Sequence, residues 1–194
     1  MRILHIGATG LVGRHVLARL LAEPGIERVT APTRRALPLP HPKLSNPVVD
    51  FDALPADAGW WPCDAMLCTL GTTMRQAGSR EAFRKVDFAY PLAAAQIAHR
   101  HGARTFVLNS AMGADPRSRI FYSRVKGELE SALADIGFAS LCLVRPGLIG
   151  GERDARRPGE HLAGIALRTM APLLPRRWRI NPASRIADAM VDAA

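Results

Sequence analysis

Three glycines at three-residue intervals, Gly7, Gly10 and Gly13, separate an apolar run from a helix-like pattern near the start of the chain. The mostly apolar residues 3–6 predict a buried strand. The apolar residues that follow recur at the spacing of one helix face, and they are Leu11, Val12, Val16, Leu17, Leu20 and Leu21. The glycines therefore mark a junction where a strand turns directly into a helix.

This junction predicts a phosphate-binding turn. A helix that begins here points unpaired backbone N–H groups and the positive end of its dipole at the crevice beyond the strand, where a pyrophosphate commonly binds. Glycine suits the turn because a Cβ atom would hold the phosphate away. The alternative is a tight turn with no ligand, since G-x-x-G-x-x-G differs from the commoner G-x-G-x-x-G. The residues predicted to contact a dinucleotide here are Gly7, Thr9, Gly10, Leu11, Val12 and Gly13.

Further strand and helix patterns alternate along the chain. Short apolar runs predict strands at residues 28–31, 48–49, 64–70, 105–109 and 141–144, with a proline-rich loop between the first two. Residues 79–100 and 122–133 follow helical patterns, the first with an irregularity near Pro91. We therefore predict an α/β fold of three layers, α/β/α, on a doubly wound parallel sheet that binds ligands beyond the carboxyl ends of its strands.

The length of 194 residues fits a single domain, residues 1–194. A small segment at about residues 147–180 is expected on the substrate side of the sheet. Apolar helical faces at residues 163–174 and 184–193 are assigned to packing or to oligomer contacts, so a homodimer is one expectation.

The net charge of +9 raises the question of a nucleic-acid partner. Of the 26 basic residues three are lysines, so 23 are arginines. They are scattered, with short clusters at residues 34–35, 156–157 and 176–179, and form no long basic arm or aromatic-interleaved stripe. The sequence therefore disfavours direct nucleic-acid binding, and a small polyanionic ligand accounts for some of the charge equally well.

Cys63, Cys68 and Cys142 lie in apolar or strand-like surroundings without C-x-x-C spacing. Such cysteines favour reduced core thiols in a cytoplasmic protein. The histidines show no zinc-binding pattern, so no metal is expected. The first strand follows Met1 and Arg2 directly, and no apolar run reaches the ~18 residues that cross a bilayer, so we expect neither a signal peptide nor a membrane partner.

Tyr122 and Lys126 lie four residues apart and so share one face of a predicted helix. The chain has two tyrosines and three lysines, so chance predicts about 0.03 such pairs. Ser110 ends a predicted strand twelve positions before Tyr122, at the sheet edge where ligands bind. The three side chains are predicted to converge as catalytic residues. The alternatives are an ordinary surface pair and a serine that only ends a strand.

The glycine turn, Ser110 and Tyr122-x-x-x-Lys126 together resemble the atypical branch of the short-chain dehydrogenase/reductase superfamily, which has the Rossmann fold and binds NAD(P). Longer stretches are similar to its Tat-interacting-protein group and the bacterial relatives of that group. These stretches are Asn109-Ser110-Ala111-Met112-Gly113-Ala114-Asp115, Tyr122-Ser123-Arg124-Val125-Lys126-Gly127-Glu128, Arg145-Pro146-Gly147 and Arg157-Pro158-Gly159-Glu160. The resemblance covers nearly the whole chain and implies the fold and NADP(H) more directly than a substrate.

The resemblance implies an oxidoreductase mechanism. A tyrosine titrates near a pKa of ~10, and a nearby lysine cation favours the phenolate and lowers that value. Tyr122 is expected to donate a proton to a small carbonyl substrate during hydride delivery, Lys126 to tune Tyr122 and bind the nicotinamide ribose, and Ser110 to orient the carbonyl. Two alternatives stay open, a non-catalytic NADP(H) sensor or protein-binding scaffold and a nucleotide-sugar epimerase with the same three residues.

Arg34 and Arg35 follow the second predicted strand, where an NAD enzyme commonly has an acidic residue for the ribose diol. Arginine suits a 2′-phosphate, so NADP(H) is predicted over NAD(H), and the alternative is two solvated loop arginines. The resemblance implies further cofactor contacts. At the adenine and ribose these are Asp50, Leu70 and Gly71. Beside the nicotinamide they are Pro146 and Leu148. Residues 151–160 are expected either to hold an anionic substrate or to form a loop with internal ion pairs.

Overall fold

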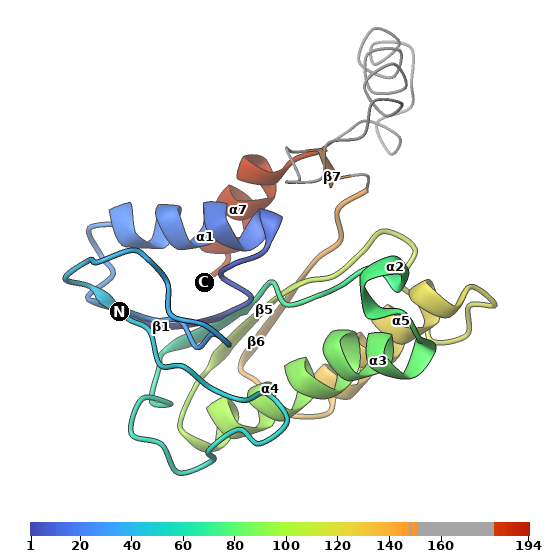
Figure 1. The fold of residues 1–194 in the computed structure, drawn as a ribbon, viewed down its shortest axis with the longest axis horizontal. Helices are drawn as coiled ribbons and strands as arrows, with labels where there is room; N and C mark the ends of the chain where they lie inside the picture. The colour runs from blue at the N-terminus through green and yellow to red at the C-terminus, as the bar shows by residue number, and fades with distance from the viewer. Residues whose placement is uncertain (148, 151–180) are drawn as a thin grey trace, which may run out of the picture.

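The structure, a computed structural model, describes residues 1–147, 149–150 and 181–194 (Figure 1). A six-stranded parallel sheet has the strand order β3-β2-β1-β4-β5-β6. Its strands are β1 (Arg2–Ile6), β2 (Arg28–Thr30), β3 (Leu44–Ser45), β4 (Ala65–Cys68), β5 (Thr105–Asn109) and β6 (Ser140–Val144). The order runs outward from β1 in both directions, which confirms the predicted doubly wound sheet and puts its switch point between β1 and β4.

Helices cover both faces of the sheet, as Figure 1 shows. On one face α1 (Leu11–Ala22) packs against α7 (Ala183–Asp192), and on the other α4 (Tyr90–Arg100) packs against α5 (Phe121–Ala134). The short elements α2 (Met74–Ala77), α3 (Arg80–Arg84) and the π-helical turn η1 (Lys85–Ala89) precede α4, and β7 (Ile149–Gly150) pairs in parallel with β8 (Asn181–Pro182). The predicted three-layer architecture is confirmed, and so is the packing role of the helix at residues 184–193.

Two apolar clusters fill the layers because successive side chains of a strand point to opposite faces. In β1, Ile3 joins the cluster beneath α1 and α7, whereas Leu4 and Ile6 join the cluster beneath α4 and α5. Cys63 and Cys68 are buried free thiols, and burial raises the pKa of each to about 12. Both are therefore uncharged core residues at neutral pH.

The helix predicted at residues 79–100 forms with its irregularity in the predicted place. Its first turn is α3, its middle is η1, and the Tyr90 N–H donates to the carbonyl of Lys85, five residues earlier. Pro91 explains the wider turn, because proline has no N–H and its ring clashes with the carbonyl four residues earlier, which belongs to Asp87. Gly102, with a φ of +94°, follows the end of the helix.

The third predicted strand, residues 48–49, is misplaced. β3 instead pairs Leu44 and Ser45 with β2, and Val48 forms only an isolated bridge to Thr33. Pro47 divides the two pairings because it has no N–H, although its carbonyl accepts from the Thr33 N–H at 3.1 Å. The chain therefore runs beside β2 earlier than the apolar pattern indicated.

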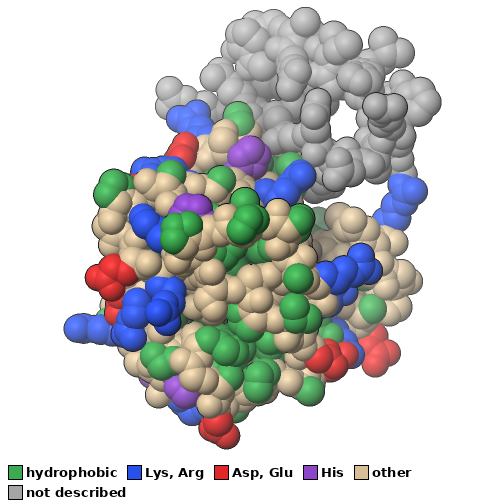
Figure 2. All heavy atoms as spheres, turned by 60° about the vertical axis from the view of Figure 1, so that its left-hand side comes forward, with side chains coloured by type: hydrophobic (Ala, Val, Ile, Leu, Met, Phe, Trp, Pro, Cys, Tyr) green, Lys and Arg blue, Asp and Glu red, His purple; other side chains and the backbone are tan. Residues whose placement is uncertain are grey.

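The surface carries its basic residues in separate groups. On the face drawn in Figure 2, Lys and Arg side chains lie between neutral and apolar ones, with acidic side chains among them. Across the described parts of the chain, no helix is both long and apolar enough to pass through a bilayer.

Candidate active site

The glycine turn forms where β1 meets α1, and two of its glycines are required by close packing. Gly7 has a φ of +90°, and a Cβ atom there would lie 2.4 Å from the backbone nitrogen of Leu70. A Cβ atom on Gly13 would lie 2.0 Å from the carbonyl oxygen of Gly7. No side chain fits either position, so the first turn of α1 lies directly against the end of β1 and the segment after β4.

The first turn of α1 has free backbone donors. Gly10 is its N-cap, provides no side-chain cap, and donates its own N–H to the Gly7 carbonyl at 3.0 Å. The first helical bond comes from Arg14 to the Gly10 carbonyl at 2.9 Å, so the N–H groups of Leu11, Val12 and Gly13 have no acceptor within the helix. This helix end, which has no acidic residue in its first turn, fits a pyrophosphate.

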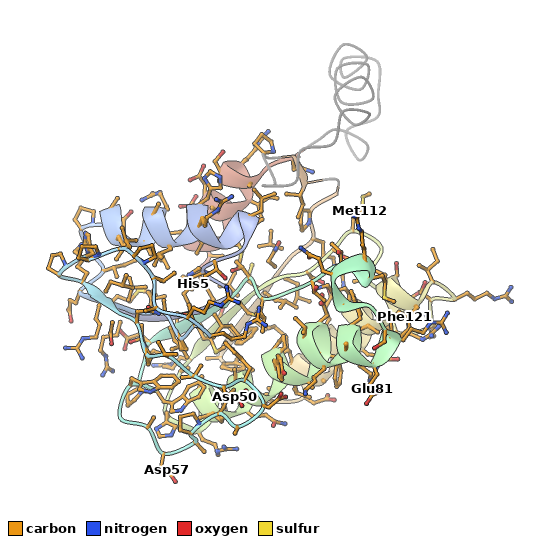
Figure 3. The ribbon with its side chains drawn as sticks, viewed as in Figure 1. His5, Asp50, Asp57, Glu81, Met112 and Phe121 are labelled. Atoms are coloured by element: carbon orange, nitrogen blue, oxygen red, sulfur yellow. The ribbon has the colours of Figure 1, made fainter. Side chains whose placement is uncertain are left out.

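A buried histidine supports the turn from below. His5 on β1 is fully buried beneath α1 (Figure 3), and its Nε2 lies 3.0 Å from the Thr69 hydroxyl. That hydroxyl donates to the Ile6 carbonyl at 3.2 Å, so it accepts from a protonated Nε2. Burial lowers the pKa of His5 to about 3, which keeps the ring neutral, and its Nδ1 has no described partner.

Lys126 is the buried cation of the site. Its side chain on α5 is 5% exposed, and Nζ lies 2.8 Å from Oδ1 of Asp87, whose side chain is 1% exposed. Burial alone would lower the pKa of Lys126, but the adjacent Asp87 carboxylate outweighs it and raises that pKa above its usual value. Lys126 is therefore a permanently charged, fixed ammonium group.

Asp87 is held in turn by backbone groups. Its second oxygen, Oδ2, accepts from the Thr72 N–H at 2.7 Å, and a Cβ atom on Gly71 would lie 3.2 Å from Oδ1 and 3.7 Å from the Lys126 Nζ. Gly71 thus passes directly against the ion pair, and Leu70, half-buried, adjoins Gly7. The segment after β4 therefore connects the glycine turn to Lys126, as the proposed cofactor contacts at Leu70 and Gly71 require.

Tyr122 lies one turn before Lys126 on α5 and is 38% exposed. Its ring packs on Phe83 of α3 with the centroids 5.7 Å apart. Tyr122 and Lys126 are at positions i and i+4 of α5, so their side chains lie on the same face of the helix. An accessible phenol beside a buried ammonium group is the arrangement that proton donation needs.

Ser110 follows β5 at the same edge of the sheet, but its hydroxyl is already engaged. Ser110 is 4% exposed, its N–H donates to the Val144 carbonyl at 2.8 Å, and its Oγ donates to Oε1 of Glu130 at 2.5 Å. Arg145 donates to both oxygens of the same carboxylate. Ser110 thus lies near the predicted location with its single proton directed at Glu130.

Arg34 and Arg35 follow β2, are exposed, and form no ion pair with any residue that the structure describes. Their loop is fixed by Thr33, whose hydroxyl donates to the Arg35 carbonyl at 2.6 Å. Asp50 is exposed and accepts from the Asp52 N–H at 2.9 Å. In Figure 3 it lies well away from Met112, which belongs to the segment after β5.

Pro146 is the last of the predicted cofactor contacts that the structure describes. Its carbonyl accepts from the Met112 N–H at 2.8 Å, so the segments after β5 and β6 are joined here. Leu148 and residues 151–160, which were predicted at the nicotinamide and the substrate, lie outside the described residues, as does the helix expected at 163–174.

No protein-family model matches the chain, but named proteins are similar over most of it. Fmp52 of Emericella nidulans is 36% identical over 168 residues, which cover 81% of this chain and 71% of fmp52. HTATIP2 of Rattus norvegicus is 37% identical over 180 residues, which cover 89% of this chain and 71% of HTATIP2. The chain belongs to their family, the atypical short-chain dehydrogenases/reductases. The resemblance given by its motifs is thereby confirmed.

Solved structures show the same fold for this short-chain dehydrogenase/reductase. The oxidoreductase ylbE of Lactococcus lactis has a TM-score of 0.70 at 19% identity over 99% of this chain and 84% of that one. WbmH of Bordetella bronchiseptica, in complex with NAD+, has a TM-score of 0.69 at 17% identity, over 99% of this chain and 71% of WbmH. Human SDR39U1, an epimerase family protein with NADPH, has a TM-score of 0.56 at 23% identity, over 87% of this chain and 60% of SDR39U1. The chain therefore shares the Rossmann fold of these structures.

The family relatives correct one prediction from the sequence, the location in the cell. The predicted cytoplasmic location is wrong, because fmp52 of Emericella nidulans is a mitochondrial protein. The cysteine argument did not separate these compartments, since reduced core thiols occur in either. The motifs were also compared with bacterial members of the group, whereas these two relatives are fungal and mammalian.

Proposed function

We propose that this protein is an NADP(H)-dependent oxidoreductase that reduces a small carbonyl compound. One observation carries the proposal: the accessible phenol of Tyr122 lies one helical turn from the Lys126 ammonium group, which Asp87 holds at 2.8 Å in a buried position. A surface pair on a helix would need neither the burial of Lys126 nor a buried counter-ion.

The residues present fit a nicotinamide dinucleotide. The N–H groups at the start of α1 suit the pyrophosphate, and Gly71 passes close beside Lys126, the residue proposed to bind the nicotinamide ribose. Arg34 and Arg35 are available for a 2′-phosphate, which favours NADP(H). Structural neighbours solved with NAD+ and with NADPH agree with the cofactor class.

The proposed mechanism assigns each side chain one task. The dinucleotide, when bound, supplies the hydride. Tyr122 donates its phenolic proton to the oxygen of the substrate carbonyl as the alcohol forms. Lys126 stabilises the phenolate that remains, because an adjacent cation favours the charged form of a phenol. Asp87 keeps the Lys126 ammonium group in place through the 2.8 Å contact between Oδ1 and Nζ.

Replacement of Tyr122 by Phe tests the proton donor. We expect Tyr122→Phe to abolish NADPH oxidation across a panel of carbonyl compounds, while NADPH titrations followed by fluorescence change little. The matched control is Tyr90→Phe, because Tyr90 is the other tyrosine and its hydroxyl donates to Asp52 on the surface at 2.7 Å. Retained turnover in Tyr122→Phe would exclude the proposed donor, and NADPH binding without any turnover in the unmodified protein would favour the sensor alternative.

Replacement of Arg34 by Ala tests the cofactor preference. A charge-assisted hydrogen bond to a 2′-phosphate contributes about 1.5–3 kcal/mol, so Arg34→Ala should weaken NADPH binding by about tenfold to hundredfold and leave NADH binding unchanged. Arg28→Ala is the control, since it removes the same charge at the opposite end of β2. Equal losses in the two variants would show that only net charge matters.

A further inference from the structure

Glu130 is a buried carboxylate that the proposed mechanism does not use. It lies on α5, one turn after Lys126, and is 5% exposed. Three donors reach it: the Ser110 Oγ at 2.5 Å and the Arg145 Nε at 3.0 Å, both to Oε1, and the Arg145 Nη2 at 2.5 Å to Oε2. The cluster joins the ends of β5 and β6 to the helix that carries Tyr122.

The chemistry of these groups fixes the direction of the Ser110 hydrogen bond. Both oxygens of Glu130 accept from the Arg145 guanidinium, in the bidentate geometry of a guanidinium–carboxylate ion pair. An ionised carboxylate has no proton to give, so Ser110 must be the donor. A hydroxyl has one proton, and once this proton is directed at Glu130 the Ser110 oxygen retains only acceptor capacity.

We propose that Glu130 and Arg145 are positioning residues that hold Ser110 as a hydrogen-bond acceptor, so that Tyr122 alone donates to the substrate oxygen. This inference rests on the proposed reductase activity. It revises the expectation that Ser110 orients the substrate carbonyl, because a carbonyl oxygen needs a donor and Ser110 has none free.

Glu130→Gln reverses the polarity of the cluster without changing its shape. Arg145 has only donors, so the amide oxygen of the glutamine turns toward Arg145 and its NH2 group toward the Ser110 oxygen. The Ser110 proton is then released toward the site. The Ser110 hydroxyl should therefore assist the reaction in the Glu130→Gln background and contribute little in the unmodified protein.

The test is a cycle of four proteins: unmodified, Ser110→Ala, Glu130→Gln and the double variant. We measure kcat/KM for NADPH-dependent reduction of 4-nitrobenzaldehyde as the carbonyl probe. Ser110→Ala should lower kcat/KM less than tenfold in the unmodified background and more than tenfold in the Glu130→Gln background. Glu128→Gln is the matched control, because it removes the same charge two residues earlier on α5 where the carboxylate pairs with Arg84 and Arg124.

Thermal unfolding of the same proteins gives a readout that needs no substrate. Ser110→Ala should lower the unfolding midpoint further in the unmodified background, where it removes a charge-assisted hydrogen bond, than in the Glu130→Gln background. The effects on activity and on stability thus run in opposite directions. A merely structural role for Ser110 would make them run together.

Two results overturn the inference. One is a loss of a hundredfold or more in kcat/KM for Ser110→Ala in the unmodified background, which would show that Ser110 donates to the substrate directly. The other is an equal shift of the unfolding midpoint in both backgrounds, which would show that Ser110 and Glu130 are not coupled. If the unmodified protein reduces no carbonyl compound, the reductase proposal fails, and the unfolding cycle still decides whether Glu130 holds the Ser110 proton.

Discussion

The two sides of the site are formed by different kinds of groups, backbone atoms on one and charged side chains on the other. On the side of β1 and α1, backbone atoms form the site: Gly7, Gly13 and Leu70 pack closely together, and the first three N–H groups of α1 have no acceptor within the helix. On the side of α5, buried charged side chains form the site, in the pair Lys126–Asp87 and in the cluster around Glu130. The first side depends on the absence of side chains, whereas the second depends on each side chain having its partner.

We expect the largest loss in the free energy of unfolding when one member of the buried ion pair is removed. Asp87→Leu leaves the Lys126 ammonium group buried without a counter-ion and should cost about 3–5 kcal/mol in the free energy of unfolding, measured with urea. The double variant Asp87→Leu/Lys126→Met should recover most of that loss, because an apolar pair of similar volume replaces the ion pair. A double variant as unstable as Asp87→Leu would mean that the charge balance is not what stabilises this side.

The glycine side should respond to added volume instead. Gly13→Ala places a methyl group 2.0 Å from the Gly7 carbonyl oxygen, so we expect a loss of about 3 kcal/mol in unfolding free energy together with weakened NADPH binding. Gly25→Ala is the control, since no atom lies within 4 Å of its added Cβ. Unaltered stability in Gly13→Ala would show that the turn yields to a side chain.

His5 makes the glycine side sensitive to acid. Its pKa is lowered to about 3 in the folded protein from 6.5, so below pH 6.5 the unfolded state binds more protons and stability falls as pH falls. Between pH 6.5 and pH 5 this loss amounts to about 2 kcal/mol. Urea unfolding at several pH values should give a shallower decline for His5→Gln than for the exposed control His15→Gln. Parallel declines would assign the acid sensitivity to other groups.

The smallest effect should come from the solvent-facing side of α5. Glu128 pairs with Arg84 and Arg124, and all three side chains are partly exposed. Glu128→Gln should therefore change the unfolding free energy by less than about 1 kcal/mol. A loss as large as that of Asp87→Leu would show that exposure does not separate the two kinds of ion pair.

The same contrast explains what the sequence could predict. The glycine turn and the Tyr122–Lys126 pair were found because each depends on neighbours within a few positions. Asp87 and Glu130 were missed because their partners come together only in the folded sheet, and Ser110 lies 20 positions from Glu130. Weak signals existed, since Pro91 follows Asp87 by four residues and Glu130 follows Lys126 by four.

The prediction of the third strand at residues 48–49 was wrong for a related reason. The apolar pair Val48–Val49 suggested a strand, but the hydrogen bonds between strands do not depend on side-chain polarity. The half-buried Leu44 and the exposed Ser45 form the ladder instead. Asn46 then spans the interruption, because its side chain donates to the Ala31 carbonyl at 2.5 Å. Such a polar bridge has no periodicity that a sequence pattern would show.

The π turn at Lys85–Ala89 also bears on insertions and deletions in this helix. It spaces its hydrogen bond over five residues where an α-turn uses four, so it holds one residue more than a regular helix needs. Loss of a single residue here would remove the wider turn, and the Pro91 ring would then clash with the carbonyl four residues before it. The loss would also rotate the preceding turn by about 100° relative to the following one, since each helical residue advances by that angle. The register of this one turn thus determines both that Pro91 fits the helix and that Asp87 is presented to Lys126.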